Sequence, residues 1–89
     1  MKYAVSLSRE AVKELSRLDK TLEQRLQKRF DELAGNPFDP RLSHEVKMVP
    51  EQRYSRVGDR RIFFEIHEST RTLAIIAIRP RGRAYQKGK

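Results

Sequence analysis

The sequence contains no cysteine, few glycines and prolines (four of each among 89 residues), and no long apolar run. The absence of cysteine excludes disulfide bonds and thiolate chemistry, and it favours a reducing, cytoplasmic setting. No segment reaches the length that spans a bilayer, and Met1–Val5 alternates instead of forming the core of a signal peptide. We therefore expect a soluble, cytoplasmic protein with no membrane partner.

The sequence also lacks the residue patterns of several common active sites. His44 and His67 have no carboxylates at metal-ligand spacing, which argues against a metal or other cofactor. No serine stands in a nucleophile-elbow context, and no glycine-rich phosphate loop precedes a helix. The acidic residues are scattered, so any acid–base chemistry must use tyrosine, arginine, lysine or the substrate itself.

Charge is abundant, and it is unevenly distributed. The formal net charge is +8, with 36% of residues charged and 37% hydrophobic, which suits one domain (1–89) with a modest core. Residues 1–36 carry eight basic and six acidic side chains, whereas residues 37–89 carry twelve and six. This excess predicts a polyanionic partner, nucleic acid first and an anionic membrane or acidic protein next.

Residues 2–36 read as one strand and two helices. Lys2–Leu7 alternates with the period of a half-buried strand, and Ser8 can cap a helix over Arg9–Leu18. Asp19 can cap a second helix that ends at Gly35-Asn36-Pro37. The residues expected to be buried in the helices are Val12, Leu15 and Leu18 in the first and Leu22, Leu26, Phe30 and Leu33 in the second.

The second half reads as strands. After a connector over Pro37–Ser43, strands are expected at Glu45–Val49, Tyr54–Val57, Arg61–His67 and Thr72–Ile78. The last is apolar on both faces (Leu73, Ile75 and Ala77 on one, Ala74, Ile76 and Ile78 on the other), as in a central strand covered on both sides. The predicted fold class is α+β, a small antiparallel sheet with both N-terminal helices on one face.

Two arginine-rich segments, Arg53–Arg61 and Arg79–Tyr85, place guanidinium groups at strand ends beside tyrosine. Arginine gives bidentate donors to phosphate and stacks on bases, so the segments are typical of an RNA-binding groove. Arg56 and Arg61 straddle the Gly58-Asp59 turn and are expected on one face of a hairpin, with Arg60 facing the other way as a surface residue. Neither helix is rich in arginine, which disfavours readout of duplex DNA.

These features support a family resemblance over almost the whole chain. Four segments carry it: Ala11–Leu15 with Leu18 after the first strand, Asn36-Pro37 after the second helix, Arg56–Arg61, and Arg79–Tyr85. On these segments the chain resembles the RelE/ParE superfamily of toxins, and within it the archaeal RelE branch. Arg60 departs from the family's usual tyrosine, and Pro80 from its usual histidine or lysine.

The resemblance implies a toxin of a type II toxin–antitoxin system that cleaves mRNA on the ribosome without metal, by attack of a ribose 2′-hydroxyl on the adjacent phosphate. Carried over by position, Arg56, Arg61 and Arg81 would stabilise the transition-state phosphate. Tyr85 would stack on the substrate or exchange a proton with it. Further RNA-binding candidates are Lys47, Arg53, Tyr54, Arg79 and Arg83.

The resemblance also implies a partner, a RelB-like antitoxin that wraps an extended chain over the basic groove and the helices. Two other functions stay open. The ParE branch shares the fold and poisons DNA gyrase without enzymatic activity, and the charge alone is compatible with an RNA- or ribosome-binding module that does not cut.

Overall fold

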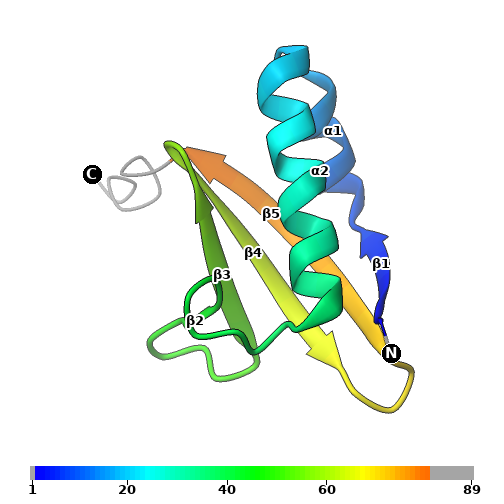
Figure 1. The fold of residues 1–89 in the computed structure, drawn as a ribbon. Helices are drawn as coiled ribbons and strands as arrows, with labels where there is room; N and C mark the ends of the chain where they lie inside the picture. Colours follow the sequence, from blue (N-terminus) through cyan, green and yellow to red (C-terminus); the bar gives the residue numbers. More distant parts are fainter. Residues whose placement is uncertain (1, 81–89) are drawn as a thin grey trace.

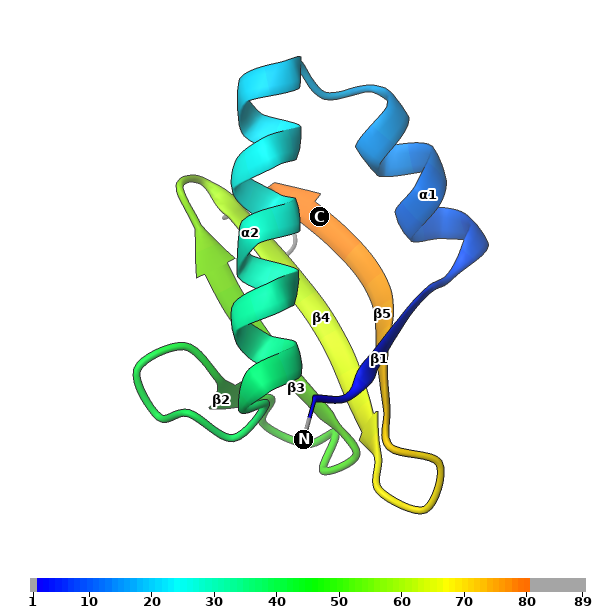
Figure 2. The same ribbon diagram turned by 45° about the vertical axis from the view of Figure 1, so that its right-hand side comes forward.

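The computed structural model describes residues 2–80, which form a five-stranded sheet with two helices on one face (Figure 1, Figure 2). The elements are β1 (Ala4–Leu7), α1 (Arg9–Ser16), α2 (Lys20–Gly35), β2 (His44–Glu45), β3 (Gln52–Val57), β4 (Arg60–His67) and β5 (Thr72–Pro80). The α+β class with both helices on one face is as predicted. No helix within residues 2–80 is long and apolar enough to cross a membrane.

The sheet is mixed, whereas a wholly antiparallel sheet was expected. The strand order is β1-β5-β4-β3-β2, and β1 runs parallel to β5 while the other neighbours are antiparallel. Antiparallel neighbours here follow each other along the chain, so short connections set their direction. β1 and β5 are separated by every other element, so no hairpin turn fixes their relative direction.

Local capping explains where the helices begin and end. The Ser8 side chain accepts a hydrogen bond from the backbone N–H of Ala11 (3.0 Å), and Asp19 accepts one from that of Leu22 (2.9 Å). α2 ends at Gly35, as predicted, but α1 ends at Ser16, two residues before the expected end.

The prediction that Val12 of α1 is buried in the core is wrong. Val12 is 50% exposed, whereas Ala11 and Leu15 are buried. α1 lies beside the β1 and β5 side of the sheet in Figure 2, so only a narrow stripe of the helix meets the core. Ala11 and Leu15, four residues apart, make that stripe, and Val12 falls outside it.

The core lies between the helices and one face of the sheet. From α2 it takes Leu26, Phe30 and Leu33, three of the four residues that helical spacing predicted, and Leu22 packs against it half-buried. The sheet contributes Val57, Ile62, Phe64, Leu73, Ile75 and Ile78.

A β-bulge in β5 changes which residues face the core. Phe63 pairs with Ala77 but Phe64 pairs with Ile75, so Ile76 has no partner in the ladder. As a result Ile75 and Ile78 are both buried against the helices although they are three residues apart. The predicted partition of this strand into two faces therefore holds for Leu73 and Ile75 and is wrong beyond the bulge, where Ala77 and Ile78 exchange faces. Both helices cover the same face of the sheet, so the strand is not covered on both sides as expected (Figure 1).

The prediction of a strand at Glu45–Val49 is also wrong, because β2 contains only His44 and Glu45. The chain leaves the sheet and forms a loop in which Met48 adopts a φ of 68° and is 93% exposed. A left-handed residue followed closely by Pro50 does not continue a ladder. β3, β4 and β5 are each longer than predicted and contain the predicted segments.

Candidate nucleic-acid interface

Three arginines lie in one row across the sheet. Arg56 of β3 pairs with Arg61 of β4, and Arg61 pairs with Arg79 of β5. Their strand neighbours Val57, Ile62 and Ile78 are buried in the core, so alternation puts the arginines on the face opposite the helices. The predicted shared face of Arg56 and Arg61 is confirmed, and Arg79 joins them. We call these three residues the arginine row.

Aromatic rings form a second row on the same face. On β3 and β4 each ring lies two residues from the arginine of the same strand, Tyr54 before Arg56 and Phe63 after Arg61. His44 pairs with Tyr54, and Tyr54 pairs with Phe63. The ring centroids lie 5.3 Å apart in the first pair and 6.1 Å in the second. The Arg61 guanidinium carbon lies 4.9 Å from the centre of the Tyr54 ring, a cation–π contact that joins the two rows.

Sequence reasoning did not identify His44 and Phe63 as part of this surface. The pairing of β2 with β3 and of β3 with β4 brings both rings to Tyr54, and that register became visible only in the structure.

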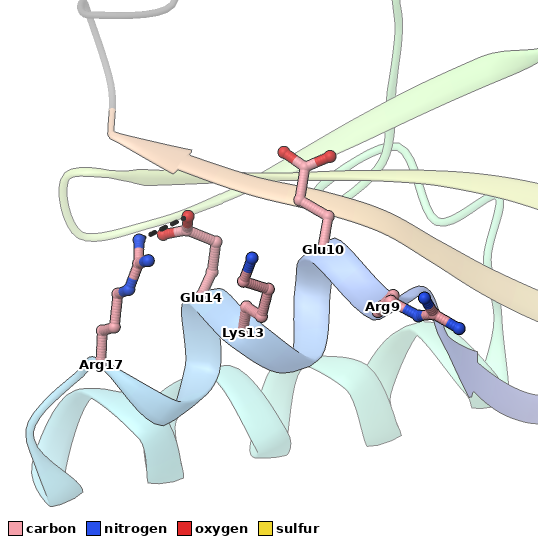
Figure 3. A pocket seen from close by; sticks show the side chains of 5 residues that line it. All are labelled: Arg9, Glu10, Lys13, Glu14 and Arg17. Carbon is pink, nitrogen blue, oxygen red and sulfur yellow. Dashed lines mark hydrogen bonds and ion pairs between the residues drawn. The ribbon is translucent and has the colours of Figure 1, made fainter.

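One carboxylate partly neutralises the arginine row. Arg79 lies beyond the part of β5 that pairs with β1, at an open edge of the sheet beside α1. There it forms an ion pair with Glu10 of α1 at 3.1 Å, and both side chains are about half exposed (48% and 50%). Figure 3 shows Glu10 on α1 with the other charged side chains of a shallow cleft along this helix, among them Glu14 paired with Arg17. An exposed pair of this kind is weak and readily exchanged for another anion.

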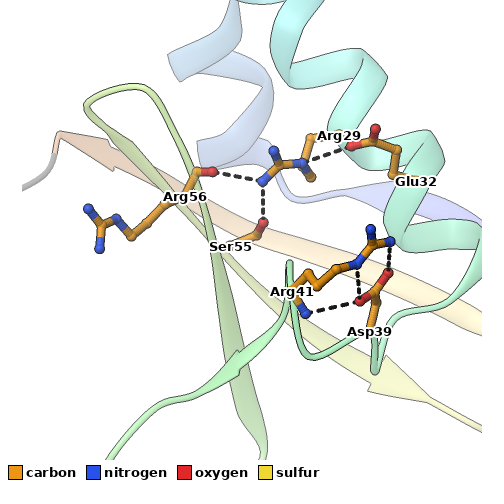
Figure 4. A network of polar contacts seen from close by, with 6 residues as sticks. All are labelled: Arg29, Glu32, Asp39, Arg41, Ser55 and Arg56. Carbon is orange, nitrogen blue, oxygen red and sulfur yellow. Dashed lines mark hydrogen bonds and ion pairs between the residues drawn. The ribbon is translucent and has the colours of Figure 1, made fainter.

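A partly buried network holds β3 at the level of Arg56 (Figure 4). One guanidinium nitrogen of Arg29 donates to the Ser55 hydroxyl at 2.8 Å and to the Arg56 carbonyl at 2.7 Å. Its Nε donates to Glu32 at 2.9 Å. Arg29 therefore fastens this helix to the strand that carries Arg56, a role that sequence reasoning did not identify.

The structure separates two of the predicted RNA-binding residues from the arginine row. Arg53 faces the helix side of the sheet, where its Nε donates to the Ser43 hydroxyl at 2.5 Å and its guanidinium lies 5.5 Å from the centre of the Phe38 ring. Lys47 lies exposed in the loop between β2 and β3. Tyr54 and Arg79, by contrast, belong to the two rows.

Three further predicted site residues, Arg81, Arg83 and Tyr85, lie outside the described residues. Within residues 2–80, no group of three or more histidine, cysteine or acidic side chains is arranged to hold a metal ion. His67 lies at the end of β4, 3.4 Å from Glu65.

Hydrogen bonds shift the pKa values of three ionisable groups outside the rows, Asp39, Arg41 and Tyr3. The Arg41 side chain donates to the Asp39 carboxylate at 2.9 Å, and this holds the pKa of Asp39 below its usual value. The Tyr3 hydroxyl donates to Glu68 at 2.9 Å, and this hydrogen bond, with burial second, raises the pKa of Tyr3.

A small mixed sheet with two helices on one face matches the fold of RelE toxins, and comparison with known proteins identifies the family. A model of the ParE toxin of the type II toxin–antitoxin system, parDE, matches residues 5–85. The chain therefore belongs to this family within the RelE/ParE superfamily of toxins. No curated protein matches the chain.

Solved structures of toxins share the fold. The RelBE2 toxin–antitoxin complex of Mycobacterium tuberculosis is similar with 19% identity and a TM-score of 0.80, over 91% of this chain and 100% of that chain. The archaeal RelE–RelB complex of Pyrococcus horikoshii is similar with 25% identity and a TM-score of 0.77, over 93% of this chain and 99% of that chain. The isolated E. coli RelE toxin is similar with 16% identity and a TM-score of 0.79, over 93% of this chain and 88% of that chain.

Proposed function

We propose that this toxin is a metal-independent, ribosome-dependent mRNA endonuclease that inhibits translation in the cytoplasm. The observation that carries the proposal is the pair of rows on the open face of the sheet. Guanidinium groups at Arg56, Arg61 and Arg79 suit a phosphodiester backbone, and rings at Tyr54 and Phe63 suit bases that stack. Proteins that bind single-stranded RNA commonly combine both kinds of contact.

In the proposed reaction, the ribose 2′-oxygen attacks the adjacent phosphorus and the bond from phosphorus to the 5′-oxygen breaks. The products are a 2′,3′-cyclic phosphate and a 5′-hydroxyl. The 2′-hydroxyl loses a proton, and the leaving oxygen gains one. Arg56, Arg61 and Arg81 would stabilise the negative charge that grows on the phosphoryl oxygens, and Tyr85 would exchange a proton or stack on a base.

The other predicted RNA-binding residues are assigned according to where they lie in the fold. Tyr54 and Arg79 lie in the rows and are proposed to hold the message beside the reacting phosphate, together with Arg83. Arg53 is engaged by Ser43 on the other face, so we assign it to the fold and not to RNA.

We also propose a RelB-like antitoxin as the partner. The solved relatives from M. tuberculosis and P. horikoshii are complexes of a RelE toxin with a RelB antitoxin. The net charge of +8 favours an acidic binding segment that covers the arginine row.

A gyrase poison is the second candidate, because the family model that matches is described as the ParE toxin of parDE. Arg60 and Pro80, which depart from the RelE pattern, are compatible with it. A poison of this kind would need no RNA chemistry at the arginine row.

The two candidate functions, mRNA cleavage and gyrase poisoning, predict different products in growth-arrested cells. The toxin would be induced in cells without antitoxin, as wild type, Arg61→Ala and Arg81→Ala, with mRNA ends mapped by primer extension and gyrase cleavage complexes assayed in parallel. Cuts in translated messages, lost in both variants, support the endonuclease. Gyrase complexes without cuts support the poison, and growth arrest with neither points to a ribosome-binding module.

A further inference from the structure

A second basic site lies behind the hairpin that carries Arg56 and Arg61. The start of α2, the turn before it and the Gly58-Asp59 turn between β3 and β4 enclose a cleft of about 510 Å³. Its charged lining residues are Arg17, Asp19, Arg25, Asp59 and Arg60. It opens on the helix side of the sheet, so it is separate from the arginine row.

Arg25 reaches the cleft from α2 and lies against the hairpin turn. Gly58 has a φ of +59°, and a Cβ placed on it would lie 3.4 Å from a guanidinium nitrogen of Arg25. The glycine thus lets the turn form and lets the guanidinium pack on its backbone. Among residues 2–80, Arg25 makes no hydrogen bond or ion pair, so its donors are available to a ligand.

Arg60 enters the same cleft from the start of β4. It faces away from Arg61, as strand alternation predicts, but it is no ordinary surface residue, because its side chain is only 24% exposed. Its Nε is buried and makes no hydrogen bond within the described residues. An oxygen of Asp59 lies 3.9 Å away, too far for a hydrogen bond.

The acidic residues of the cleft compensate these guanidinium groups only weakly, because the ion pair between Asp59 and the Arg60 Nε is long, at 3.9 Å. Asp19 is engaged in capping α2 through its hydrogen bond from the Leu22 backbone. Asp59 points into solvent, with its side chain 81% exposed. A buried donor without an acceptor is costly, and a bound anion would remove that cost.

We propose that this cleft binds a phosphate of an RNA backbone through Arg25 and Arg60. RNA is the favoured anion because the Val57–Arg60 pair directly follows the Arg56–Arg61 pair in the hairpin. The cleft and the arginine row therefore share one hairpin end, and an RNA strand that passes round this end meets both. The choice of RNA rests on the proposed function; the anion site itself rests on the cleft.

The test is equilibrium binding of the purified full chain to a fluorescent 2′-O-methyl RNA oligonucleotide and to ribosomes, over a series of salt concentrations. The variant is Arg25→Gln/Arg60→Gln. The matched control is Arg9→Gln/Lys28→Gln, which removes the same charge from exposed helix positions outside the cleft. Asp59→Asn, which removes a negative charge from the rim, is the complementary variant.

We expect the cleft variant to bind RNA about tenfold more weakly than the control at 0.1 M salt, with a salt slope smaller by about 0.7 for each phosphate lost. Asp59→Asn should bind about twofold more tightly. Loss on the oligonucleotide assigns the phosphate to the message, and loss on ribosomes alone assigns it to ribosomal RNA.

Equal binding of the oligonucleotide and of ribosomes by the cleft variant and the control would overturn the proposal. If the cleft variant does not fold, unchanged RNA affinity in Asp59→Asn overturns it and tighter binding supports it. The cleavage assay is separate: a wild-type toxin that binds RNA in this way but does not cut refutes the endonuclease and leaves the cleft site standing.

Discussion

Arg29 of α2 donates a 2.8 Å hydrogen bond to Ser55 of β3, a fully buried serine on the core side of the sheet. The same nitrogen reaches the carbonyl of Arg56, the next residue along the strand. One guanidinium thus joins the helix layer to the strand that presents Arg56 on the opposite face. The backbone of Arg56 is therefore held by a contact made on the other side of the sheet.

Removing this guanidinium should destabilise the fold. Arg29→Met leaves the Ser55 hydroxyl buried without its donor, which costs about 1–3 kcal/mol of unfolding free energy. Urea denaturation followed by circular dichroism measures it. Lys28→Met, on the exposed neighbouring position, is the control, and equal losses in the two variants would contradict the role of Arg29.

The arginine row should act on the reaction more than on stability. Arg56→Ala and Arg61→Ala are expected to lower the rate of ribosome-dependent cleavage about 100-fold each, the usual effect of removing one donor to a developing negative charge. Single-turnover kinetics on programmed ribosomes gives the rate. Arg9→Ala should cut like wild type, and undiminished cleavage in Arg61→Ala would remove this residue from the site.

Ser8 connects a helix cap to the bulge. Its hydroxyl accepts from Ala11 and donates to the carbonyl of Ile76, the residue without a ladder partner. Ser8→Ala should therefore cost about 1–2 kcal/mol, at the upper end for a cap. Ser16→Ala, which removes an exposed hydroxyl at the end of α1, should cost less than about 0.5 kcal/mol in the same denaturation experiment. Similar losses would mean that the bulge contact is negligible.

The Asp39–Arg41 pair should make stability depend on acid pH. The pKa of Asp39 is lowered in the fold from its usual 3.8, chiefly by the hydrogen bond from Arg41. The pair therefore stabilises the protein above pH 3.8, and this contribution is lost as the pH falls through the lowered pKa. Denaturation midpoints between pH 2 and 6 should fall less steeply in Asp39→Asn. Parallel pH curves for wild type and variant would refute the link.

Sequence signals such as helix caps, helical spacing and a hairpin turn predicted the elements whose contacts join residues close together in the sequence. The caps Ser8 and Asp19 and the apolar spacing of α2 act within a few residues, so both helix starts and most of the core stripe were correct. The Gly58-Asp59 turn likewise fixed the hairpin and with it the common face of Arg56 and Arg61. Each of these features depends on contacts that are short in sequence.

The features that sequence reasoning missed depend on contacts that are distant in sequence. The parallel pairing of β1 with β5 joins the two ends of the described chain, and no turn encodes it. The roles of Arg29 and Arg53 are set by Ser55 and Ser43, which the sequence alone does not bring near them. Arginines look alike in a sequence, and only their partners separate structural ones from those that face a ligand.

The bulge at Ile76 has an evolutionary consequence. It shifts the alternation of β5 by one position, so that Ile75 faces the helices and Arg79 still faces away from them. In a strand of strict alternation these two residues, four apart, would share a face. Loss of the bulge without a change in length would therefore turn Arg79 to the helix side of the sheet, whereas deletion of one residue at the bulge would restore strict alternation and keep Arg79 on the open face. The extra residue and the bulge must therefore be gained or lost together if β5 is to keep its arginine on the binding surface.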